Sequence, residues 1–220
     1  MSFSNCNSVK HKHHFNYDFE NPSIDISLTK SLKEISGLTF LNENSIACIN
    51  DEKGIIFNID LTTQKQTKII EFKTEGDYEG IQKVNNSFFI LKSNGDLYEV
   101  DSKGEFVVYS LFKMGFEFEG LTISPNGKSL LLACKKHEKK KRDDHLWVFE
   151  FDLKSKQLLK DPFLKLSKDK IIKSFRPSGI AFHPNGNLFI ISGVSNTIME
   201  LNQNFEIVNQ TKLPEFKYPQ

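Results

Sequence analysis

The chain has 220 residues, of which 38% are hydrophobic, and its 29 basic and 28 acidic residues leave a net charge of +1. This length fits one domain, and the apolar fraction is enough for a packed core, which excludes wholesale disorder. A net charge so close to zero gives no general attraction to nucleic acid, which we do not expect as a partner. No run of about 18 apolar residues is present, so we expect no membrane-spanning helix.

Residues 1–14 read as a disordered N-terminal tail without the apolar region of a signal peptide. The histidines of this tail suit a solvated segment better than a metal site (His11, His13 and His14). Cys6 would be a lipid-bearing cysteine if the chain began further upstream, although the preceding Asn5 is a poor match to the usual small residue. Residues 15–28 then read as one or two strands that precede a propeller domain over 15–220.

A short motif recurs along the rest of the chain: a Ser-Gly or Glu-Gly pair followed by alternating apolar residues. Its strings are ISGLTF, YEGIQKV, FEGLTIS and PSGIAFHP, and the motif glycines are Gly37, Gly80, Gly120 and Gly179. Their spacings are 43, 40 and 59 residues. The first two spacings match the period of about 40–45 residues of β-propeller blades. The charged run 135–145 and the polar stretch 166–174 account for the longer third interval.

Each motif opens a series of four β-prone segments separated by turn residues. In chain order the expected strands are 35–40, 45–50, 54–60 and 67–72, then 79–84, 87–93, 96–101 and 105–111, then 119–124, 129–134, 145–152 and a weaker 158–166, and finally 178–184, 188–193, 197–202 and 206–213. The second segment of each series is almost wholly apolar, as expected of a strand covered on both faces. Cys48 and Cys134 lie in two of these segments and are expected to be small buried hydrophobic residues.

These observations predict an all-β fold, a β-propeller of four-stranded antiparallel blades that begin near residues 35, 78, 118 and 177. A fifth motif is due near position 221, beyond Gln220. We therefore expect four visible blades with a fifth incomplete or missing, as in a truncated chain. A complete ring of four blades is the alternative.

Several longer strings resemble the SdiA-regulated, YjiK-like family of bacterial propeller proteins: EISGLTF, INDEKGIIFNID, GDYEGIQ, FEFEGLTISPNGKSLLLACK and FRPSGIAFHPNGNLFIIS. The resemblance covers roughly residues 24–220. It implies a β-propeller of the cell envelope, periplasmic or membrane-anchored, with a further Glu-Gly motif near its C-terminus. The resemblance implies no catalytic activity.

The residue before each motif glycine opens the innermost strand of its blade, so the four side chains are expected to converge at one mouth of the central channel. These residues are Ser36, Glu79, Glu119 and Ser178. Carboxylates and hydroxyls are hard oxygen ligands that suit Ca²⁺, which is the expected cofactor if any is bound. The alternative is that the two carboxylates accept backbone hydrogen bonds and close the ring.

A second polar ring follows the second strands and is expected on one face of the disc. It consists of Asn50, Asp51, Lys92, Ser93, Lys135 and Ser192. This mixture suits an anionic or polyhydroxylated ligand, whereas the simpler interpretation is that strand ends are polar because they meet water.

Two functions from different classes follow. The first is a non-catalytic propeller that binds Ca²⁺, a small molecule or a protein, and that we expect to be a monomer. The alternative is a metal-dependent hydrolase of the lactonase or phosphoesterase type, with a channel metal as Lewis acid. The alternative needs a general base near the metal, for which His183 and Asp51 are the candidates. No nucleophile motif or nucleotide-binding loop is present.

Overall fold

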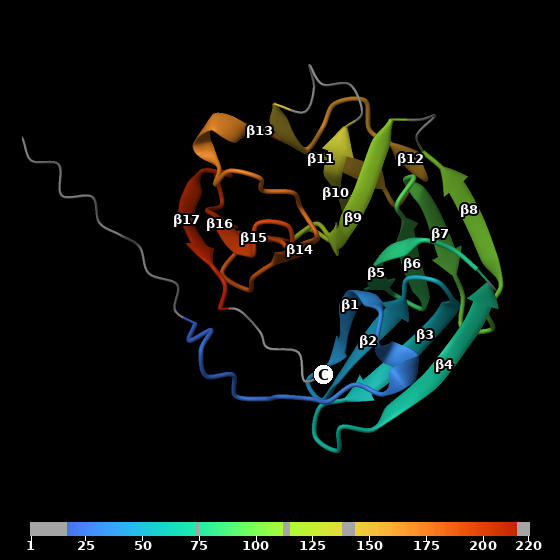
Figure 1. The fold of residues 1–220 in the computed structure, drawn as a ribbon. Coiled ribbons are helices and arrows are strands. Elements are labelled where there is room, and N and C mark those ends of the chain that lie inside the picture. The colour runs from blue at the N-terminus through green and yellow to red at the C-terminus, as the bar shows by residue number, and fades with distance from the viewer. Residues whose placement is uncertain (1–16, 74, 112–114, 138–143, 215–220) are drawn as a thin grey trace, which may run out of the picture.

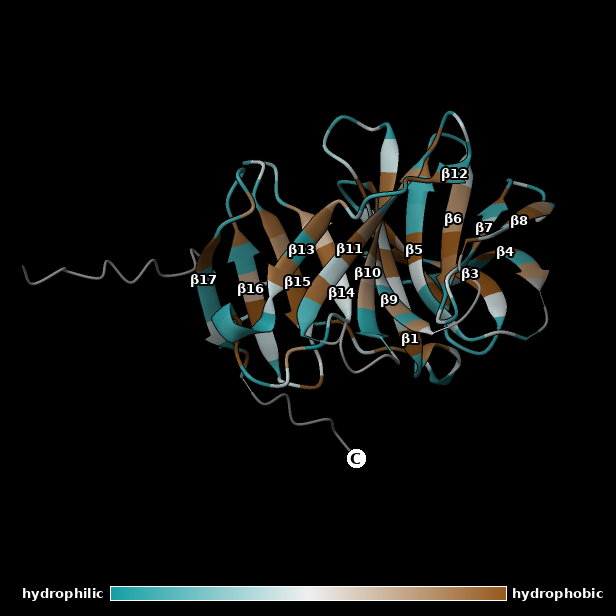
Figure 2. Cartoon of the chain, turned by 90° about the horizontal axis from the view of Figure 1, so that it is seen from above, coloured by the Kyte–Doolittle hydropathy of each residue, from teal (hydrophilic) through white to brown (hydrophobic). Residues whose placement is uncertain are grey.

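The computed structural model describes residues 17–73, 75–111, 115–137 and 144–214. The tail of residues 1–14, with Cys6, His11, His13 and His14, lies outside these ranges. Within them, four antiparallel sheets are packed one after another around a central channel (Figure 1), which confirms the predicted β-propeller. In the edge-on view the strands run across the disc from one face to the other (Figure 2).

Each blade follows the chain from the channel outward. The first contains β1 (Ile35–Asn42), β2 (Ser45–Asn50), β3 (Gly54–Asp60) and β4 (Gln66–Lys73). The second contains β5 (Tyr78–Val84), β6 (Ser87–Lys92), β7 (Asp96–Val100) and β8 (Phe106–Ser110). The third contains β9 (Phe116–Ile123), β10 (Ser129–His137), β11 (His145–Asp152), β12 (Gln157–Leu158) and β13 (Leu164–Ser167). The fourth contains β14 (Gly179–Phe182), β15 (Leu188–Ser192), β16 (Thr197–Leu201) and β17 (Ile207–Lys212).

The outer strand of the third blade differs from the single weak strand expected over 158–166. Two short strands, β12 and β13, both pair with β11 and together replace it. Pro162 lies between them and has no N–H to donate to the sheet, which explains the interruption.

Apolar side chains from the second and third strands hold neighbouring blades together. Three separate clusters join the first blade to the second, the second to the third, and the third to the fourth. Every residue of β10 from Ser129 to Cys134 is buried, as expected of a strand sandwiched between two blades. Cys48 and Cys134 are both buried, which confirms their prediction as small core residues.

The segment before the first blade is not a strand, contrary to the sequence prediction. Residues 17–34, here termed the N-terminal strap, contain only a short 3-10 turn, η1 (Lys30–Leu32). The strap's backbone is held by side chains: Gln66 Nε2 donates to the Ser27 carbonyl at 2.9 Å, and Gln66 Oε1 accepts from the Thr29 N–H at 2.9 Å. Because these partners are side chains rather than the backbone of a strand, no ladder forms.

The strap runs from the fourth blade to the first (Figure 1) and packs on both. At one end, Tyr17 makes ring contacts with His183 and Phe189 of the fourth blade. At the other end, Leu32 is fully buried in a small cluster with Cys48. The strap therefore covers part of the side where no blade lies between the fourth and the first among the described residues.

The rest of that side is open. Leu38, which follows the motif glycine of β1, is 55% exposed, whereas the corresponding Ile81, Leu121 and Ile180 are 1%, 6% and 8% exposed. The last three are covered by the preceding blade. No described helix is long and apolar enough to cross a membrane.

Candidate ligand site at the channel mouth

A β-bulge places the candidate residues of the first three blades at the start of each inner strand. The register skips Ser36 between Ile35 and Gly37. It likewise skips Glu79 and Glu119. A bulge leaves one residue without a partner in the ladder and redirects its side chain, and bulges are over-represented next to functional sites. In the fourth blade, Ser178 directly precedes β14.

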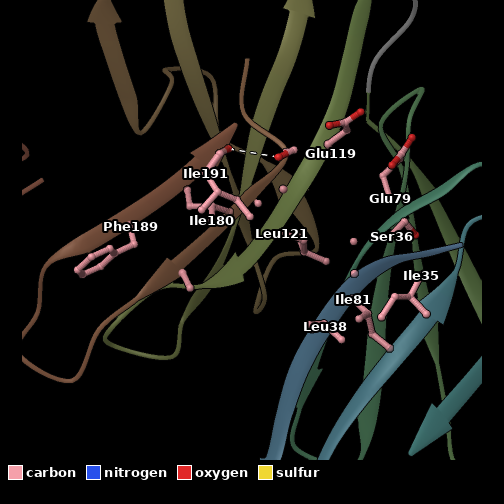
Figure 3. A pocket seen from close by; sticks show the side chains of 16 residues that line it. Ile35, Ser36, Leu38, Glu79, Ile81, Glu119, Leu121, Ile180, Phe189 and Ile191 are labelled. Atoms are coloured by element: carbon pink, nitrogen blue, oxygen red, sulfur yellow. Dashed lines mark hydrogen bonds between the residues drawn. The ribbon is translucent and has the colours of Figure 1, made fainter. Parts of the chain in front are cut away.

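All four residues line one cavity of about 300 Å³, as the sequence led us to expect. Figure 3 shows the carboxyl groups of Glu79 and Glu119 close together at one end of the cavity, with apolar side chains further along it. The apolar lining comes from all four inner strands and from β15: Ile35, Leu38, Ile81, Leu121, Ile180 and Ile191. The cavity thus has a polar mouth and an apolar wall, the usual make-up of a small-molecule site.

An ammonium group of the protein itself occupies part of the mouth. Lys135 Nζ forms an ion pair with the Glu119 carboxylate and a second one, at 2.9 Å, with Glu117. Burial opposes the charge on Lys135, but the hydrogen bonds to Glu119 and Glu117 outweigh it and raise the pKa of Lys135 above its ordinary value. Lys135 therefore stays charged and neutralises much of the negative charge of this pair of acids.

Of the three glutamates at the mouth, Glu79 is the one that forms no ion pair with Lys135. Among the described residues it has neither a hydrogen bond nor an ion pair, although it is half-buried. Burial, together with the nearby charges of Glu119, Asp77 and Asp51, raises the pKa of Glu79 to about 7, and the charge of Lys135 only partly opposes this rise. A carboxyl group with a pKa near neutrality can gain or lose its proton under ordinary conditions, which marks it as a candidate functional group.

The hydroxyl groups of Ser36 and Ser178 form hydrogen bonds with backbone groups. Ser36 Oγ donates to the carbonyl of Tyr78 in the next blade. Ser178 Oγ accepts from the Gly193 N–H at 2.9 Å and lies 3.4 Å from the Ile191 carbonyl, the dashed line in Figure 3. Both hydroxyls line the cavity, yet their hydrogen bonds hold neighbouring segments in place.

The second polar ring divides into turn residues and charged residues. Asn50 Oδ1 accepts from the backbone N–H groups of Glu52 and Lys53. Ser192 Oγ accepts from those of Arg176 and Ser195, and its side chain is almost fully buried. These two side chains stabilise turns.

The remaining members of that ring lie nearer the acidic mouth. Ser93 Oγ donates to the Asp77 carboxylate, and the Lys92 ammonium lies 5.8 Å from the centre of the Tyr78 ring. One oxygen of Asp51, Oδ1, is buried without a hydrogen-bond partner. Its carboxylate is also close enough to raise the pKa of Glu79.

Sequence reasoning overlooked Asp77 and Glu117. Each precedes a motif glutamate by two residues, in the strings DYEG and EFEG. Because alternate residues of a strand project to the same side, this spacing could have signalled a second acid beside each motif acid.

His183, the candidate general base, follows the far end of β14, while Ser178 and the mouth lie at its start. Its ring contacts Tyr17 and Phe189, and its Nδ1 accepts from the Asn185 N–H at 3.2 Å. His183 is therefore not near Glu79. Within the described ranges, no group of three or more His, Cys, Asp or Glu side chains is arranged to hold a metal ion.

Because the pKa of Glu79 is raised, the stability of the fold should depend on the charge of this residue. The stability that the raised pKa provides is fully present below pH 4.5, the ordinary value, and is lost as the pH rises through about 7. We expect Glu79→Gln to be more stable than the wild type at pH 8, by about 1–2 kcal/mol after allowance for solvent screening, and equal to it near pH 4. Urea unfolding at several pH values measures this difference.

Glu43→Gln is the matched control, because Glu43 is an exposed carboxylate in the turn between β1 and β2. Its pH profile should follow that of the wild type. If the stability of Glu79→Gln changed with pH between 4 and 8 in the same way as that of the wild type, the pKa of Glu79 would not be raised in the folded state.

No protein-family model matches the chain, and no curated protein sequence matches it. Solved structures with the same architecture do. A streptogramin B lyase is 14% identical with a TM-score of 0.49, and the match covers 82% of this chain and 55% of that chain. Virginiamycin B lyase from Staphylococcus aureus is 14% identical with a TM-score of 0.53, over 86% of this chain and 73% of that one.

A chain of a nidogen–laminin complex is also 14% identical, with a TM-score of 0.54 over 81% of this chain and 80% of that one. At such identities the likeness shows the fold alone, and this fold occurs both in a lyase and in a chain of a protein–protein complex. The function has to be argued from the site.

Proposed function

We propose that this protein is a non-catalytic binding propeller whose channel mouth takes a cation next to Glu79. The observation that carries the proposal is the unpaired, half-buried Glu79 carboxyl group at the mouth of the cavity, with a pKa of about 7. A bound positive charge would stabilise its ionised form and remove the cost of burying it. Lys135 already does this for Glu117 and Glu119 in the same mouth.

The apolar wall favours an organic cation: a small molecule with a protonated amine at the mouth and a hydrocarbon body along Ile81 and Leu121. Calcium is the second candidate, supported by the buried and unpaired Asp51 Oδ1 near Glu79. Calcium takes six to eight oxygen ligands. Glu119 is already paired with Lys135, and both serine hydroxyls are hydrogen-bonded to backbone groups. Few oxygen ligands are therefore left for Ca²⁺, and the mouth suits a single positive charge better.

The metal-dependent hydrolase receives less support, since His183 is not near the mouth and Asp51 is the one remaining candidate base. A cell-envelope location and a relationship to the SdiA-regulated, YjiK-like family remain proposals that rest on the sequence resemblance.

The test uses three probes: hexylamine, the uncharged hexanol and calcium chloride, each added to the purified chain before thermal unfolding. A ligand that binds only the folded state stabilises it, by about 2.7 kcal/mol at a hundredfold excess over Kd. We expect hexylamine to raise the Tm and hexanol to leave it unchanged. The effect should disappear in Glu79→Gln.

Lys135→Met sharpens the test because it removes the internal cation and frees Glu117 and Glu119. We expect this variant to lose about 1–2 kcal/mol of stability in the absence of ligand, since two partly buried carboxylates lose their partner. It should also bind hexylamine or Ca²⁺ at least tenfold more tightly than the wild type, as isothermal titration calorimetry would measure.

The probes separate the two cations. A rise in Tm with calcium but not with hexylamine would assign the site to the metal. If neither cation changes the Tm of the wild type or of Lys135→Met, the proposed function is wrong, and the acids of the mouth serve only to join the blades.

A further inference from the structure

The outer strand of the second blade, β8 (Phe106–Ser110), has one free edge. It pairs with β7 alone, and no other described backbone group bonds to it. Figures 1 and 2 both place it at the rim of the disc, with no described strand beyond it. Its outward-facing N–H and C=O groups are therefore open to another strand.

The side chains of β8 do not protect this edge. Phe106, Val107 and Val108 are 39%, 55% and 39% exposed, and no residue of the strand is charged. All three residue types favour β structure. Natural sheets usually protect such an edge with charges, and propellers generally leave only short, protected edges.

The other outer strands of four or more residues carry that protection, and the uncharged β12 is only two residues long. β4 contains lysine and glutamate side chains, with Lys68 paired to Glu71. β13 carries Lys165, and β17 carries Lys212 beside the polar run NQT. The contrast is within one molecule and between strands in the same position of the repeat, so the absence of charge from β8 is a local feature rather than a property of the fold.

We propose that β8 is an interaction surface that pairs antiparallel with β8 of a second copy of this chain. A two-fold axis brings the same strand to both sides of the contact, so the strand has to be compatible with itself. An uncharged strand meets this condition, because identical charges directly opposite each other would repel. The β7 charge opposite Val107 is already neutralised, because Glu99 forms an ion pair with Lys156 at 2.7 Å.

Pairing would join two second blades into one continuous eight-stranded sheet and shelter Val107 and its neighbours from water. It leaves the channel mouth of each copy untouched, so this proposal is independent of the proposed cation site. The monomer expected from the sequence is the competing possibility, and a single experiment separates the two.

Sedimentation velocity of the full chain over a range of concentrations is the test. We expect a monomer–dimer equilibrium for the wild type and a monomer at every concentration for Val107→Lys. Leu38→Lys is the matched control: Leu38 is also 55% exposed but faces the open side between the first and fourth blades. It should dimerise like the wild type.

Hydrogen exchange of the wild type gives a second readout that requires no variant. The backbone amides of residues 106–110 should become protected as the concentration rises, while those of β4 should not. A wild-type chain that stays monomeric, assembly beyond a dimer, or loss of the dimer in Leu38→Lys but not in Val107→Lys would each overturn the proposal.

Discussion

Replacement of Gly37 by alanine should cost about 3 kcal/mol of folding stability, at the upper end of the usual cost of overpacking. A Cβ atom at position 37 would lie 2.9 Å from both the Gly80 Cα and the Ile81 backbone nitrogen. Backbone atoms of the next blade cannot move aside without shifting the whole inner strand. The motif glycine is thus required for the close approach of two blades, and urea unfolding of the variant measures the cost.

Gly179→Ala is the control that the repeat itself provides. The same substitution there meets only side-chain atoms of Ile191, at 2.9 and 3.0 Å, and that side chain is 40% exposed and free to rotate. We expect Gly179→Ala to cost less than about 1 kcal/mol. Equal losses for both variants would contradict the view that β1 is in direct contact with the inner strand of the following blade, whereas no following blade lies against β14 among the described residues.

Replacement of Leu32 by alanine should cost about 3 kcal/mol and lower the Tm by about 10 °C. Leu32 belongs to the N-terminal strap and is fully buried against Cys48 and Ile59. The truncation would leave a cavity at the place where the strap covers the open side of the first blade. Differential scanning calorimetry of the variant measures both quantities.

Leu28→Ala, in the same segment, is the matched control because Leu28 is 40% exposed. Its Tm should stay within about 2 °C of the wild type. A wild-type Tm for Leu32→Ala would mean that the strap does not contribute to the folded propeller.

Part of the channel mouth could be predicted from the sequence. The motif residues Glu79 and Glu119 could be assigned to one ring because a repeat places equivalent positions at the same height in each blade. The partner of Glu119 could not be assigned in this way, because Lys135 comes from the next strand of the blade and its reach depends on the bulge and on side-chain rotamers. The two polar rings predicted separately therefore meet at Lys135.

The conformation of the N-terminal strap, in contrast, was not predicted correctly from the sequence. Its alternating residues 15–28 resemble a strand, and local pattern alone gives no reason to reject that prediction. What decided the outcome is that side chains of Gln64 and Gln66, rather than the backbone of a neighbouring strand, take up its backbone groups.

The architecture follows from sequence periodicity: a period of about 40 residues, glycines at the inner strands and apolar second strands leave few alternatives to radially packed blades. Only the tertiary structure decided how charge is distributed in the channel mouth, which side of the ring stays open and that β8 lies unprotected at the rim. The physical reason is that periodicity is a property of each blade, whereas burial, pKa shifts and exposed edges depend on which residues of other blades lie within a few ångströms.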